Sequence, residues 1–163
     1  MPNLPTLIAT HGRSLLVAAS GSDIAINAIA QGFGAVPPVY MASVQIGHAP
    51  AELMEISLPL KYPTVNIFCE KLENSLKEKF RTFSGTGRLI LEIRHSQDQI
   101  QNVQQALENY VSAVCQILDG NRGDWGSGLF YAGGYDVQFG SVKRGGKSFV
   151  QTARVALTVD ISL

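Results

Sequence analysis

The residues Gly146-Lys147-Ser148 are the part of this chain that comes closest to a chemical motif, because a phosphate-binding loop ends in Gly-Lys-Ser or Gly-Lys-Thr. That motif also requires a glycine at the position that Ser141 occupies, and a helix that follows the loop. Here the spacing differs, and the next residues alternate like a β-strand. We therefore expect no nucleotide or other cofactor at this segment.

The same glycine-rich connection, residues 140–148, carries three cations: Lys143, Arg144 and Lys147. One interpretation is a hairpin with a solvated basic tip. The other is a surface that meets an acidic partner or the phosphates of DNA. A formal net charge of +0 argues against a chain that depends on general attraction to nucleic acid.

The histidines and cysteines form no pattern typical of metal binding or catalysis. His11, His48 and His95 are far apart and have no carboxylate at ligand spacing, and His95 follows a strand, where we expect a surface or boundary residue. Cys69 and Cys115 lie in apolar runs and are expected to be small core residues. No serine lies in a nucleophile-elbow pattern. We expect no catalytic, cofactor or metal site, and no enzymatic activity.

The length and composition predict a globular protein. A chain of 163 residues that is 45% hydrophobic is most simply one domain with a real core. Only 16% of residues are charged, which favours a subunit that buries much of its surface against partners. No signal peptide and no apolar run of ~18 residues is visible. We expect a protein made in a cytosol, with no membrane contact.

The last segment, residues 149–163, alternates between apolar and polar positions almost without error, and Arg154 lies on its polar face. This is the period of a half-buried β-strand. At roughly 3.3 Å per residue it would reach about 50 Å, more than twice a usual strand. Such a strand must bend or run onto a neighbouring subunit, which favours assembly over catalysis.

Two earlier strands are predicted at 64–70 and 88–94. The spacing within 71–87 permits a short helix, and it permits equally a charged hairpin arm closed by residues 84–87. We favour the arm, because the flanking strands then pair directly.

A long helix follows. Ser96 and Gln99 form a capping box, Asp119-Gly120 ends the helix, and one apolar stripe runs along it. About 22 residues give a length near 33 Å, so the helix must lie across a sheet.

A turn-rich loop then holds Trp125, which is expected either to cover its own core or to insert into a neighbouring subunit. A third strand follows at 135–139.

The first 61 residues are less regular. Ser22 is expected to cap a short helix that begins at Asp23. Residues 35–63 contain five prolines and are predicted to form an extended arm with one strand near 39–46. The whole pattern predicts one α+β domain over 1–163, in which an antiparallel sheet in 62–163 carries one long helix across a face. The short N-terminal helix and the extended arm complete it.

The order of elements from Tyr62 to Leu163 resembles the tail terminator (tail completion) proteins of tailed bacteriophages. The likeness consists of the strand that Tyr62-Pro63 opens, the Gly-Thr-Gly hairpin, the helix and two closing strands that end in residues 155–160. It implies a hexameric ring at the head-proximal end of a tail, with tail tube and neck (connector) proteins as partners and DNA in the ring lumen. It also implies localisation in the virion. The family's contact residues form no fixed motif, so the resemblance assigns none here.

Three other functions stay open: a neck or head-completion adaptor of the same particle, a small-ligand-binding α+β domain, and a nucleic-acid-binding module. We expect the interface of a ring to draw on five residues. These are Trp125, Lys143, Arg144, Lys147 and Arg154.

Overall fold

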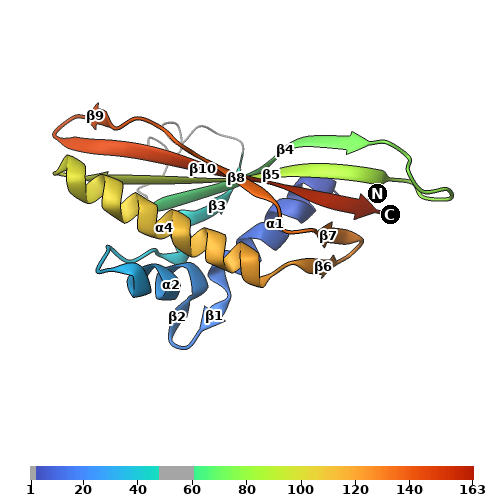
Figure 1. Ribbon diagram of the computed structural model, residues 1–163, viewed down its shortest axis with the longest axis horizontal. Helices are drawn as coiled ribbons and strands as arrows, with labels where there is room; N and C mark the ends of the chain where they lie inside the picture. The colour runs from blue at the N-terminus through green and yellow to red at the C-terminus, as the bar shows by residue number, and fades with distance from the viewer. Residues whose placement is uncertain (1–2, 48–60) are drawn as a thin grey trace.

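The sheet is built around the C-terminal strand. A computed structural model describes residues 3–47 and 61–163. Strand β10 (Ser148–Ser162) pairs antiparallel with β5 (Ser84–Gln97) over fourteen consecutive positions, from Phe149 opposite Gln97 to Ser162 opposite Ser84. Figure 1 shows that these strands run through the whole long axis of the molecule and twist strongly at its middle. The predicted terminal strand is therefore confirmed.

Shorter strands flank this central pair. Strand β4 (Thr64–Asn74) pairs antiparallel with β5, and β3 (Val44–Ile46) pairs with β4 in parallel. The far side of β10 is covered in turn by β9 (Lys143–Gly145), β8 (Tyr135–Phe139) and β7 (Leu129–Tyr131). Strand β6 (Gly123–Gly126) lies outside β7. The α+β fold is as predicted, and β3 is the exception to an antiparallel sheet.

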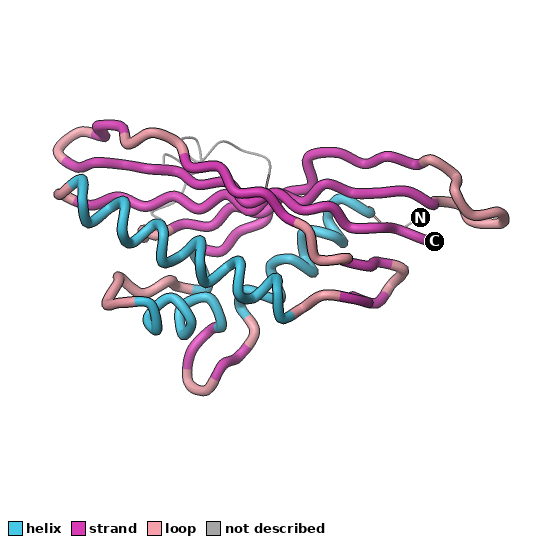
Figure 2. Tube along the Cα trace, in the orientation of Figure 1, coloured by secondary structure: helices cyan, strands magenta, loops and turns pink. Residues whose placement is uncertain are grey.

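The helices α1 (Leu4–Val17), α2 (Ala25–Phe33) and α4 (Ile100–Gly120) lie on one face of the sheet, as Figures 1 and 2 show. Helix α4 crosses β5 and β10, and α2 packs against α4. The apolar stripe predicted for α4 is buried, apart from the exposed Ile100 at its start. The helix layer and the sheet thus enclose one apolar core.

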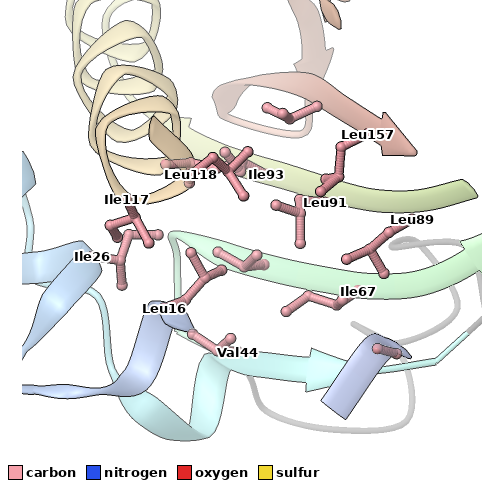
Figure 3. Packing of buried hydrophobic residues seen from close by; sticks show 14 of the residues in the cluster. Leu16, Ile26, Val44, Ile67, Leu89, Leu91, Ile93, Ile117, Leu118 and Leu157 are labelled. Carbon is pink, nitrogen blue, oxygen red and sulfur yellow. The ribbon is translucent and has the colours of Figure 1, made fainter. Parts of the chain in front are cut away.

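The core consists mainly of aliphatic side chains from alternate strand positions. Leu89, Leu91 and Ile93 of β5 point toward the helices, together with Ile67 of β4 and Leu157 of β10 (Figure 3). Burying each such side chain contributes about 1.5–3 kcal/mol. Gly12 allows α1 to lie close to this layer, because a Cβ there would come within 2.8 Å of Leu89 Cδ2.

The capping-box prediction is wrong. Ser96 and Gln97 belong to β5, and the N-cap of α4 is Gln99, whose side chain makes no capping hydrogen bond. Pairing with β10 continues to Gln97, so the strand takes up residues that locally resemble a helix start. The backbone of Gln99 begins the helix by accepting the amide of Val103 at 3.2 Å.

The N-terminal region holds two helices where one was predicted. Asn3 caps α1 by accepting the amide of Thr6, and Pro5 lies in its first turn. Helix α2 begins at Ala25, two residues later than predicted. Ser22 is not its cap, because strands β1 (Ala19–Ser20) and β2 (Asp23–Ile24) form a small hairpin there.

Much of the predicted proline-rich arm, residues 48–60, and with it His48, lies outside the described residues. The strand expected near 39–46 is present only over Val44–Ile46, after a 3-10 turn at Met41–Ser43. Among the helices described, none combines the length and the apolar character needed to cross a membrane.

Candidate functional site

The most unusual surface feature is the hairpin that joins β4 to β5. The two strands stay paired as far as Asn74 opposite Gly85, and the connecting turn, residues 75–83, projects beyond the rest of the sheet (Figure 1). We call residues 71–87 the arm. It confirms the hairpin alternative for this segment. The closing turn lies earlier than predicted, since residues 84–87 belong to β5.

Hydrogen bonds within the arm hold its turn in one shape. The side-chain oxygen of Asn74 accepts the amides of Ser84 at 3.0 Å and Leu76 at 3.3 Å. The hydroxyl of Ser84 accepts the amide of Glu78 at 3.2 Å. Because these bonds cross the turn, the arm is an ordered projection and not a loose loop.

The C-terminal residue closes the base of the turn. The carbonyl oxygen of Leu163 accepts the amides of Thr82 at 2.7 Å and Phe83 at 3.1 Å, and its own amide donates to the Phe83 carbonyl at 2.8 Å. The hydroxyl of Ser162 donates to Glu78 Oε2 at 2.7 Å. The turn is therefore fixed to the central strand as well as to itself.

This ordered turn presents two apolar side chains to solvent. Phe80 is fully exposed, with a relative accessibility of 103%, and Leu76 is 63% exposed. Both have a positive φ, +66° for Phe80 and +47° for Leu76. A bulky residue in the left-handed region costs roughly 1–2 kcal/mol, and Phe80 recovers nothing by burial within its own chain. Within the isolated subunit, the cost of this backbone conformation is therefore not offset by burial of the ring.

The opposite end of the sheet carries the predicted basic cluster. Lys143 and Arg144 lie on β9, which forms a hairpin with the start of β10, and Lys147 lies in the turn between them. All three side chains are exposed, as expected for a solvated basic tip. A hollow of about 320 Å³ beside β9 is lined by Lys143, Arg144 and the partly buried Arg94, among others.

Trp125 is not close to these cations. It lies on β6, whose partner β7 pairs with β10 at Asp160 and Ile161, whereas β9 pairs at the other end of β10. Its indole nitrogen donates to the Asn121 carbonyl at 2.7 Å, and its ring centroid lies 5.3 Å from that of Tyr131. In this chain Trp125 is a half-buried lid on its own core, and a role at an interface stays a prediction.

Arg154 belongs to an ion-pair network on the sheet face opposite the helices. It pairs with Glu70, which also pairs with Arg88 at 3.1 Å, and Arg88 reaches Asp136 at 3.4 Å. These four residues come from four adjacent strands: β4, β5, β10 and β8. The network is half-exposed, so it contributes little to the stability of the fold.

His95 contradicts the expectation of a surface or boundary position. Only 1% of its surface is exposed, and burial lowers its pKa from 6.5 to about 4, so the ring is neutral at pH 7. The alternation that turns Leu89, Leu91 and Ile93 inward also turns His95 inward, and this was the signal that sequence reasoning missed.

The cysteines and His11, the other residues that could act as nucleophiles or metal ligands, form no site in the described residues. Cys69 is buried and Cys115 half-buried, and burial raises the pKa of both thiols, which makes them poor nucleophiles. His11 is half-buried on α1. Across residues 3–47 and 61–163, no group of three metal-ligating side chains comes together.

Sequence reasoning also missed Phe80 and Phe130 as surface residues.

A scan against protein-family models finds no match to this chain, and a search of curated proteins finds no significant match.

Proposed function

We propose that this chain is a structural, non-catalytic subunit that closes into a ring of six at the head-proximal end of a phage tail. The ring ends polymerisation of the tail tube and joins the tail to the neck. The observation that carries this proposal is the arm, an ordered hairpin that holds a fully exposed Phe80 away from its own core.

The sheet supports self-assembly in a second way. Strand β8 pairs with β10 on one side only, and no described strand covers its other side. Its last residue, Phe139, is 50% exposed. An uncovered strand edge is a template for pairing with another chain, and native proteins cover or charge such edges.

A ring requires that each subunit offer one surface to the next and a different surface to the previous one. The arm lies at one end of the long axis, and the basic hairpin of β9 and β10 lies at the other (Figure 1). Distinct ends of this kind favour contacts between unlike surfaces. The basic end is also the candidate for contact with DNA in the lumen or with an acidic neck or tube protein.

The first test is the mass of the protein in solution. Light scattering should give a mass near six times the subunit mass of 17.6 kDa, and negative-stain images should show rings. A strict monomer at high concentration, over a range of salt, would contradict the proposal. Labelling the protein within a virion then separates a tail terminator, at the end of the tube, from a neck or head-completion adaptor.

A further inference from the structure

The tip of the arm carries a defined pattern of charge around its aromatic residue. Lys79 and Arg81 flank Phe80, and Lys77 lies in the same turn. The one acidic residue of the turn, Glu78, is already engaged by Arg81 at 3.3 Å and by the Ser162 hydroxyl. With three cations and one carboxylate the tip keeps a net positive charge, and its apolar ring lies between Lys79 and Arg81.

The complementary pattern lies on the outer side of the sheet. Phe130 of β7 is directly opposite Asp124 of β6 and Asp160 of β10 in the strand register. Directly paired residues project from the same face of a sheet, so the three side chains form one row. Phe130 is 49% exposed, and both aspartates are exposed. This row is an apolar ring between anions.

A hollow lies beside this row. It has a volume of about 300 Å³ and lies at the base of the same chain's arm, since its lining includes Lys77 and Glu78 as well as Phe130 and Asp160. A cavity of roughly 150 Å³ is enough to take a benzene ring, so this open hollow has the volume for a phenylalanine side chain. Phe80 of the same chain does not occupy it, because that ring is fully exposed.

We propose that the arm of one subunit docks into this hollow on a second copy of the chain. Phe80 packs beside Phe130, and Lys79 and Arg81 pair with Asp160 and Asp124. The inference rests on the proposed self-assembly and names one of its contacts, which joins two different surfaces at the arm end of the sheet and leaves the basic end free for another partner. Burial of the Phe80 ring and neutralisation of the flanking charges both favour the docked state.

The ordered turn adds to the affinity of such a contact. Because hydrogen bonds to Asn74, Ser84 and Leu163 already fix the backbone, little conformational entropy is lost when the tip docks. The positive φ of Phe80 also reduces the entropy lost on docking, because the backbone already holds the ring exposed in the free subunit.

The test is charge reversal, followed by the dissociation constant of self-association in a concentration series. Lys79→Glu and Asp160→Lys should each raise this constant about tenfold or more, because each places like charges in contact. The double variant Lys79→Glu/Asp160→Lys should return it close to the wild-type value. The matched control for Asp160→Lys is Glu108→Lys, which makes the same change of charge at an exposed position on α4. It should leave the dissociation constant unchanged.

Apolar variants test the same contact independently of charge. Phe80→Ser should weaken self-association by a similar factor, whereas Phe33→Ser, at a half-exposed position on α2, should not. Self-association that persists unchanged in both Phe80→Ser and Asp160→Lys overturns this contact and leaves the ring proposal standing. Failure of the double variant to recover also overturns it. A wild-type protein that never associates overturns both proposals.

Discussion

The ring of His95 meets the ring of Tyr110 edge to face, with their centroids 5.3 Å apart and their planes at 74°. The pair joins the end of β5 to the middle of α4. Tyr110 in turn donates its hydroxyl to the Pro37 carbonyl at 2.6 Å, and burial raises its pKa. Sheet, helix and the segment after α2 therefore meet at a neutral histidine.

Acidification should destabilise the fold through His95. Its pKa is about 4 in the folded chain and 6.5 in the unfolded chain, so between these values only the unfolded state binds the proton. The free energy of unfolding should fall by about 3 kcal/mol as the pH drops from 7.5 to 4, and this contribution should then level off. Urea unfolding over a series of pH values measures it.

The variant His95→Gln isolates this contribution. In this variant the free energy of unfolding should depend much less on pH between pH 7.5 and 4. The control His11→Gln, on α1, should keep the pH dependence of the wild-type protein. A pH dependence that is unchanged in His95→Gln would show that another group carries it.

The base of the arm should not accept any side chain at Gly85. A Cβ there would lie 1.8 Å from the Glu73 carbonyl oxygen, so β4 and β5 would have to separate. We expect Gly85→Ala to lower the free energy of unfolding by about 3 kcal/mol. Gly134→Ala, where nothing lies within 4 Å of the added Cβ, should change it by less than about 0.5 kcal/mol. Equal effects of the two variants would contradict the register found here.

The ion pairs on the outer face should contribute little to stability. Arg154 and Glu70 are 37% and 40% exposed in their side chains. Arg154→Ala should cost less than about 1 kcal/mol in unfolding free energy, and the difference should shrink at high salt. A loss of about 2 kcal/mol that salt leaves unchanged would mean that Arg154 acts through packing.

Replacing Phe80 should not harm the isolated subunit. Asparagine tolerates a positive φ better than phenylalanine, and the ring has no burial to lose. Phe80→Asn should therefore leave the free energy of unfolding unchanged or raise it by up to about 1 kcal/mol. Urea unfolding under conditions that keep the subunits apart measures this. A clear fall in the free energy of unfolding would show that Phe80 stabilises the fold of its own chain.

The long elements could be predicted because their residues alternate over many positions. The pattern of β10 and the stripe of α4 are strong enough to determine burial without knowledge of partners. The ends of these elements could not be predicted. The pairing of β5 with β10 extends β5 through Ser96 and Gln97, and this tertiary contact outweighs a local capping pattern.

Helix α1 was missed because its sequence has no clear stripe. Gly12 and the neighbouring polar residues break the pattern, yet Gly12 is what allows the helix to approach Leu89. The arm was predicted only as one of two alternatives, and the exposure of Phe80 was not foreseen. Backbone amides that donate to the side chains of Asn74 and Ser84, rather than local propensity, fix the turn that holds Phe80 in solvent.

The fourteen-position pairing of β5 with β10 also has a mechanical consequence. The hydrogen bonds of an antiparallel pair run perpendicular to its strands, so a pull along the long axis loads all of them together in shear. A chain built on such a pair resists tension along that axis far better than tension that peels the strands apart one bond at a time. The direction of greatest strength is therefore the line that joins the arm to the basic hairpin.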